Sequence, residues 1–255
     1  MKKQTETKAL LTRRKFLGTA VAATTAFSTV PIMFGCINDD NKVIPPYVTG
    51  EGVPNSKFGG VQIGAITFSF NSMSGKTAED ILRYCVESGV SSIELMGEVA
   101  EQYAGIPPAP GRPPRDMTMT PQQQAEYEAS VAKSSEEQRL WRISAPMEKF
   151  EELRKMYNEA GVNIHMAKFA PAQWSDEEID YVFNAAKALG TKAVSEELSD
   201  EACKRLGPFA EKHGMLAVFH NHTQFEDPAF TIDPFLAYSP SIMLNLENIN
   251  NKSSV

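Results

Sequence analysis

From about residue 60 onward, short apolar stretches alternate with longer stretches in which apolar residues recur every three or four positions. The short stretches have the length and composition of buried β-strands, and the longer ones have the period of amphipathic helices. The six predicted strands are residues 61–70, 91–96, 162–169, 191–198, 215–222 and 241–248. Strands that alternate with helices predict right-handed βαβ units and therefore a parallel sheet.

Capping residues indicate where the predicted helices begin and end. Thr77 with Asp80, and Ser175 with Glu178, have the spacing of capping boxes. Ser199 has the residue type expected at the N-cap of a further helix. A glycine follows each helix, at the position where the chain usually adopts a left-handed conformation. These glycines are Gly89, Gly161, Gly190 and Gly214.

The regularity of the repeat favours a barrel over an open sheet. No Gly-x-Gly-x-x-Gly pattern follows the first strand, which argues against a dinucleotide-binding sheet. A complete β/α barrel has eight strands and typically about 250 residues. The predicted fold class is therefore α/β, of the (β/α)8 TIM-barrel type, and incomplete, with about six of eight βα units within 59–255.

Residues 97–145 interrupt the repeat as a Pro-rich insertion. Its first part, 105–121, holds too many prolines for regular structure, and 122–141 then has the composition of a helix. Because the insertion follows a strand, we expect it at the C-terminal face, where barrel enzymes carry their active sites. It is expected to be either a lid or substrate-shaping loop, or a decoration or a contact in a homo-oligomer.

Residues 1–36 have the features of an export signal. Arg13 and Arg14 precede an apolar stretch that is too short and too rich in Thr and Ala to span a bilayer. The pattern resembles the twin-arginine export motif and predicts a periplasmic protein. The alternatives are a retained N-terminal anchor or a chance basic arm.

The end of this segment and the residues after it connect the signal to the barrel. Cys36 follows a small residue, which resembles a lipoprotein processing site and predicts a lipid anchor there. The alternative is ordinary cleavage nearby. Residues 37–58 are rich in Pro, Gly and Asn and are predicted to be a linker to the barrel at 59–255.

The charge of the chain argues against one class of partner, and its cysteines have the setting of buried residues. The chain has a formal net charge of −7 and residues 1–35 carry a net +5, so the remainder carries about −12. An acidic domain repels phosphate backbones, which argues against nucleic acid as a partner. Cys85 and Cys203 stand in predicted helices among apolar neighbours and are expected to be buried thiols.

Two histidines and several carboxylates stand at predicted strand ends. His220 and His222 are two positions apart on the fifth strand, so their side chains point to the same face. We expect them either to bind a metal or transfer protons, or to be satisfied by local hydrogen bonds. Glu196 and Glu197 end the fourth strand and Glu247 ends the sixth. Such carboxylates either join the histidines as ligands or only complement a helix dipole.

Three further polar residues are expected at the same mouth of the barrel. Glu94 lies on the second predicted strand, and His165 and Lys168 lie on the third. A lysine at a strand end can hold a substrate oxyanion or transfer a proton. The alternative for each is an ordinary strand-end or packing role.

Two segments resemble a known family of barrel enzymes. Residues 204–225, "KRLGPFAEKHGMLAVFHNHTQF", and 141–169 are similar to the sugar phosphate isomerase/epimerase family, the xylose isomerase-like TIM barrels. The similarity extends over about 60–255. It implies a divalent metal (Mn, Mg or Zn) and proton transfer next to the carbonyl of a small-molecule sugar or keto-sugar, giving isomerisation or epimerisation.

Residue type, position and this resemblance together assign expected roles. The expected catalytic residues are Glu197, His220 and Lys168. The expected metal ligands are Glu197, His222 and Glu247. The expected substrate-binding residues are Glu94, His165 and Asn221.

The sixth strand departs from the family pattern. The family usually reads Asn-Leu-Asp-x-Gly-His there, whereas this sequence reads "NLENIN" at 245–250, with Glu247 in place of the Asp. Strands seven and eight, which normally add a His and a Glu to the metal site, have no counterpart, as expected of a truncated or frameshifted gene. The first expectation is a metal-dependent isomerase/epimerase. The alternative is a catalytically inactive truncated remnant or a carbohydrate-binding module of the same family. A third hypothesis is a related apurinic endonuclease. The acidic charge and the export signal argue against it.

Overall fold

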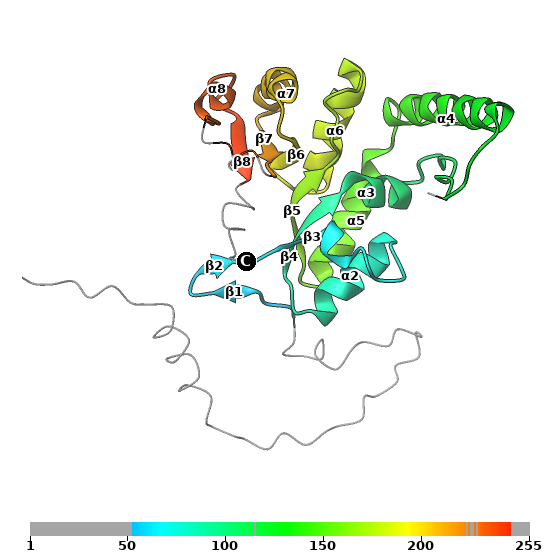
Figure 1. Cartoon of the computed structure of the whole chain (residues 1–255). Helices are drawn as coiled ribbons and strands as arrows, with labels where there is room; N and C mark the ends of the chain where they lie inside the picture. Colours follow the sequence, from blue (N-terminus) through cyan, green and yellow to red (C-terminus); the bar gives the residue numbers. More distant parts are fainter. Residues whose placement is uncertain (1–52, 115, 223, 225–226, 228, 246–255) are drawn as a thin grey trace, which may run out of the picture. The chain divides into compact units, whose positions relative to one another are not determined.

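Six parallel strands hydrogen-bond in the order in which they occur along the chain (Figure 1). The computed structural model describes residues 53–245 except 115, 223, 225, 226 and 228. The strands are β3 (Ala65–Ile66), β4 (Ser92–Met96), β5 (Asn163–Lys168), β6 (Ala193–Glu197), β7 (Leu216–His220) and β8 (Ile242–Asn245). Sequential parallel order is the topology of a β/α barrel, whereas a doubly wound sheet reverses at a switch point. The predicted α/β fold of TIM-barrel type is confirmed, and the described strands form an incomplete barrel.

The first predicted strand, 61–70, is wrong over most of its length. The structure divides it into β2 (Val61–Gln62), the short β3 and a 3-10 helix, η1 (Thr67–Phe70). Strand β2 pairs antiparallel with β1 (Lys57–Phe58), and the turn at 59–60 consists of two glycines with φ of 56° and 87°. Two consecutive residues with positive φ form the tight turn that suits an antiparallel hairpin. The last two residues of the predicted linker therefore belong to a hairpin.

The helices between the strands are α2 (Ala78–Glu87), α5 (Met147–Glu159), α6 (Asp176–Ala188), α7 (Asp200–His213) and the short α8 (Asp233–Leu236). Helices α2, α6 and α7 begin at the predicted caps, whereas no cap was predicted for α5 and α8 was not predicted. Thr77 with Asp80, and Ser175 with Glu178, form capping boxes in which side chain and backbone bond reciprocally. Gly214 ends α7 in the left-handed conformation. These local signals mark the starts of α2, α6 and α7.

The insertion contains one helix that was not predicted. Helix α3 (Gly97–Ala104) begins directly at the end of β4, and α4 (Pro121–Arg142) is the predicted helix of the insertion. A Cβ atom on Gly97 would lie 2.4 Å from Cδ1 of Phe169, so a larger residue does not fit there. Between α3 and α4, the described residues form no helix or strand, in agreement with the proline content.

The core lies between the sheet and its helices. Alternate strand residues point away from the barrel interior, toward the helices, and are fully buried. Examples are Ile93, Leu95, Val194 and Phe219. They belong to one cluster with helical residues that include Phe150, Leu153, Ile179, Phe183 and Leu206. Cys85 and Cys203 are also fully buried, and burial raises the pKa of each thiol to about 12. The prediction of two buried thiols is confirmed.

Several predictions fall on residues outside the described part of the chain. They are the export signal at 1–36, the lipid anchor at Cys36, most of the linker and the carboxylate of Glu247. Among the described residues, no helix combines the length and the apolar character needed to cross a membrane.

Candidate active site

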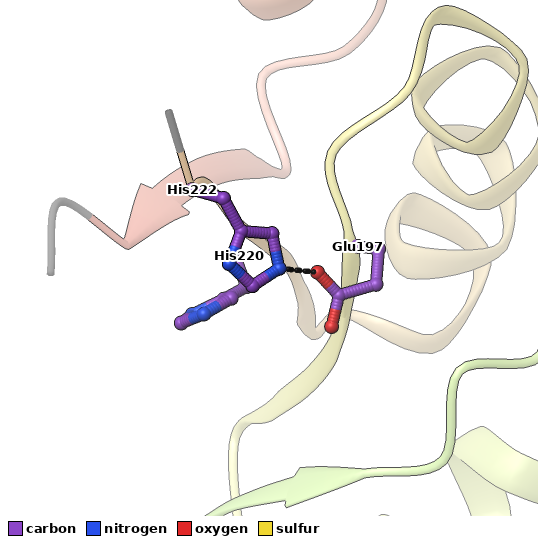
Figure 2. A group of neighbouring side chains, drawn as sticks. All are labelled: Glu197, His220 and His222. Atoms are coloured by element: carbon purple, nitrogen blue, oxygen red, sulfur yellow. Dashed lines mark hydrogen bonds and ion pairs between the residues drawn. The ribbon is translucent and has the colours of Figure 1, made fainter. Parts of the chain in front are cut away.

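Glu197 and His220 end neighbouring strands and pair directly in the sheet. The register of β6 and β7 places Glu197 opposite His220, and His222 follows two residues later. Glu197, His220 and His222 each offer one ligand atom, and the three atoms lie within 4.8 Å of one another (Figure 2). We call these three residues the Glu–His group. The structure thus brings together the carboxylate and both histidines that the sequence placed at one mouth.

The Glu–His group is held by contacts among its own members. Nε2 of His222 lies 2.8 Å from Oε2 of Glu197 (Figure 2). The rings of His220 and His222 meet edge to face, with centroids 4.7 Å apart. The side chains of His222 and Glu197 are 59% and 47% exposed. A dissolved ligand can therefore reach them.

Lys168, at the end of β5, bonds the other oxygen of the same carboxylate. Its ammonium donates to Oε1 of Glu197 at 2.5 Å. Burial opposes ionisation of Glu197, but the hydrogen bond and charge of Lys168, together with His222 and His220, outweigh it. The pKa of Glu197 therefore lies below its ordinary value, and the carboxylate is charged at neutral pH.

The donor set of the Glu–His group fits a divalent metal ion. One carboxylate oxygen and two imidazole nitrogens suit borderline ions such as Zn²⁺ or Mn²⁺. Bonds of about 2.0–2.2 Å place two ligand atoms at most about 4.4 Å apart, so small side-chain rotations suffice to reach a binding geometry. Even with all three residues as ligands, coordination positions would stay open, as in catalytic metal sites.

Two of the predicted substrate-binding residues lie deeper, nearer the N-terminal ends of the strands. Glu94 is 4% exposed and accepts a hydrogen bond of 2.5 Å from Oγ of Ser195. His165 lies where the register between β4 and β5 shifts, and its Nδ1 is 2.9 Å from Oγ of Ser92. The imidazole is open to solvent on one side, yet the surrounding protein desolvates it and lowers its pKa. Glu94 and His165 therefore form a second level below the Glu–His group.

Asn221 and Glu196 are both buried polar residues beside the site. Asn221, the residue after β7, is fully buried, and its Nδ2 donates to the backbone carbonyl of His222 at 3.4 Å. Glu196 is buried on the opposite face from Glu197 and accepts from the backbone N–H of Ala172 at 2.8 Å. The position of Glu196 follows from strand alternation, because neighbouring residues point to opposite faces.

Two serines beside the site were not predicted from the sequence. Ser195 is two residues before Glu197, and Ser92 is two residues before Glu94, so each faces the same side as its carboxylate. Each bonds a predicted site residue: Ser195 bonds Glu94, and Ser92 bonds His165. The period of two along each strand was the signal that could have identified them.

Comparisons with known proteins show similarity to solved barrel structures. No family model and no curated protein matches the chain. The probable 3-DHS dehydratase AsbF of Bacillus anthracis, involved in petrobactin synthesis, is 14% identical with a TM-score of 0.44, over 72% of this chain and 62% of that one. A sugar phosphate isomerase/epimerase from Parabacteroides distasonis is 16% identical with a TM-score of 0.40, over 75% and 66%. A D-psicose 3-epimerase is 9% identical with a TM-score of 0.38, over 71% and 62%. The chain spans less than two thirds of the length of these structures.

Proposed function

We propose that this chain is a metal-dependent isomerase or epimerase that moves a proton next to the carbonyl of a sugar or keto-sugar. The observation that carries the proposal is the Glu–His group at the C-terminal ends of β6 and β7, with Lys168 bonded to the same carboxylate. This is the end of a β/α barrel at which active sites form. The resemblance of residues 141–169 and 204–225 to the isomerase/epimerase family points to the same chemistry.

Two residues of the Glu–His group would hold the ion. Glu197 offers a carboxylate oxygen and His222 an imidazole nitrogen, and Glu247 is the third ligand that the sequence predicts, outside the described residues. When bound, a divalent ion polarises a carbonyl and stabilises the negative charge that develops on its oxygen. Nε2 of His222 now bonds Glu197, so this contact would open if both residues held an ion, while Lys168 can keep its bond to the other carboxylate oxygen.

His220 and Lys168 supply the acid and base for the proton transfer. His220 takes the proton from the carbon beside the carbonyl, and the ammonium of Lys168 gives a proton to the carbonyl oxygen, which yields an enediol. For isomerisation, a hydroxyl proton of the enediol then returns to the lysine, and the imidazolium delivers its proton to the former carbonyl carbon. Each proton removed is thus restored to the product. Epimerisation would instead require a second proton donor on the opposite face of the original carbon, so His220 and Lys168 support isomerisation more directly.

A second candidate, a carbohydrate-binding module without catalysis, is favoured by one observation. Both oxygens of Glu197 already have partners within the protein, Lys168 and His222. A carboxylate that is satisfied by its own neighbours gains less from an added ion. Such a module would bind the sugar but leave its carbon–hydrogen bonds intact.

Solvent exchange separates the two candidates. The full chain is incubated with Mn²⁺ and a ketohexose in D₂O, and deuterium at the carbons beside the carbonyl is followed by NMR. The proposal predicts protein-dependent deuterium incorporation that EDTA abolishes. Binding of the sugar without any incorporation above the protein-free rate would contradict it and support the binding module.

A further inference from the structure

A hollow of about 440 Å³ lies on the inner face of the sheet, below the Glu–His group. Its walls include residues of β3 and of β8, the first and last strands of the parallel sheet. Val218 lines it, two residues before His220, and Ser195, two residues before Glu197, bonds the lining residue Glu94. Because side chains two apart share a face, the hollow continues inward from the Glu–His group. Its volume lies in the range of small-ligand pockets, roughly 300–1,000 Å³.

One wall of the hollow carries hydrogen-bonding groups. Glu94 and His165 line it, and Ser195 and Ser92 bond them from the strands beside. The register shift in β5 explains how His165 and the next residue, Met166, both line the hollow. The position of His165 also depends on Gly64, since a Cβ there would lie 3.0 Å from its Cε1 atom. These groups are therefore fixed by the fold.

Apolar side chains also line the hollow. They are Met166, Val218, Met243 and Leu244. A lining that combines C–H groups with hydroxyl, imidazole and carboxyl groups suits a ligand with both kinds of surface. An open-chain or cyclic polyol has hydroxyls that hydrogen-bond and a carbon skeleton that packs against apolar groups.

The charges around the hollow disfavour a phosphorylated ligand. Among the described residues that line it there is no lysine or arginine, and Glu94 is a carboxyl group. The nearest cation at the mouth, Lys168, is already bonded to Glu197. Proteins bind phosphate through lysine, arginine or the N-termini of helices, and apart from Gly64 the lining residues lie in strands and in the four-residue η1.

We propose that the hollow binds the uncharged, polyhydroxylated part of the substrate, so that the substrate is an unphosphorylated sugar. The inference rests on the proposed function for the placement of the reacting carbonyl at the Glu–His group. Glu94 and His165 are then specificity-determining residues that hydrogen-bond substrate hydroxyls, and Met243 faces the skeleton of the sugar.

A matched pair of unreactive ligands tests this assignment. Binding of D-glucitol and of D-glucitol 6-phosphate to the full chain is measured by calorimetry at constant ionic strength. We expect glucitol to bind at least about tenfold more tightly than its phosphate ester. Equal or tighter binding of the phosphate ester would overturn the inference.

Adding a cation to the hollow reverses the preference. Met243 is 49% exposed, so Met243→Lys is tolerated by the fold. The lysine is expected to raise the affinity for the phosphate ester about tenfold, because a charge-assisted bond to phosphate is then available. Met243→Gln is the uncharged control and is expected to leave that affinity unchanged. A lysine variant with no gain for the phosphate ester would contradict the position of the ligand.

A second variant keeps the test independent of position 243. His165→Leu removes a hydrogen-bonding ring and is expected to weaken glucitol binding about tenfold, while Mn²⁺ binding at the Glu–His group is retained. Unchanged glucitol binding would argue against the hollow as its site. Glucitol has no carbonyl, so its binding does not depend on catalysis. If glucitol binds but a ketohexose shows no deuterium exchange, only the proposed function is contradicted. If exchange occurs only with phosphorylated sugars, only this inference is contradicted.

Discussion

Glu197→Gln is expected to abolish most of the metal-dependent exchange at the carbon beside the sugar carbonyl. The substitution keeps the size of the side chain but removes the charge that attracts the ion and the ammonium of Lys168. Loss of a group that positions an acid–base step lowers the rate by about 100- to 10,000-fold. The deuterium incorporation rate at saturating ketohexose and Mn²⁺ measures the effect. Glu201→Gln, an exposed carboxyl on α7, is the matched control and should exchange at the wild-type rate.

The pH dependence of stability gives an independent readout for the same carboxylate. The pKa of Glu197 is lowered in the folded protein, so the stability from its pair with Lys168 is fully present above the ordinary carboxyl pKa. That contribution is lost as the pH falls through the lower, folded pKa. Without metal, the difference in melting temperature between wild type and Glu197→Gln should therefore be constant near neutral pH and shrink in acid. A difference that grows in acid would contradict the pairing.

Arg142→Met is expected to cause the largest loss of stability among single substitutions in the insertion. Nε of Arg142 donates to Glu101 at 2.7 Å, its NH1 group donates to Glu178 at 3.2 Å, and its guanidinium lies 3.8 Å from the ring centre of Trp174. Burial alone would lower the pKa of Arg142, but the hydrogen bonds and charges of both carboxylates outweigh it and raise the pKa. Removing the cation leaves two buried carboxylates uncompensated, which costs about 3–5 kcal/mol.

Urea unfolding of three variants distinguishes the lost ion pair from lost packing. Arg142→Met should lower the unfolding midpoint with an unchanged slope. Arg139→Met is the control on the same helix, and its midpoint should not change, because Arg139 pairs with Glu136 on the surface. Adding Glu101→Gln to Arg142→Met should restore part of the loss. A double variant less stable than Arg142→Met would show that the packing of the arginine, and not its charge, stabilises the end of α4.

Local signals in the sequence were enough to predict most of the fold and the Glu–His group. Caps such as Ser175 with Glu178, and the apolar strands between them, depend only on neighbouring residues. The meeting of Glu197 and His220 followed from the rule that parallel strands end at one mouth of a barrel.

The deeper part of the site depends on pairing between distant segments. Whether His165 faces inward is decided by the register shift between β4 and β5, which no local pattern encodes. Arg142 and Glu101 are 41 residues apart in sequence, and their contact requires α3, which the sequence did not reveal. The first strand was misread because the apolar run at 61–70 contains two short strands and a 3-10 helix.

Metal binding to the full chain decides whether the Glu–His group is a metal site. Mn²⁺ is titrated into the metal-free protein, and free ion is counted by electron paramagnetic resonance. We expect one tightly bound ion per chain that is lost in the His222→Gln variant, whose melting temperature without metal should remain close to that of the wild type. Absence of stoichiometric binding by the wild-type protein, or full retention by the His222→Gln variant, would contradict the claim that Glu197 and His222 hold the metal.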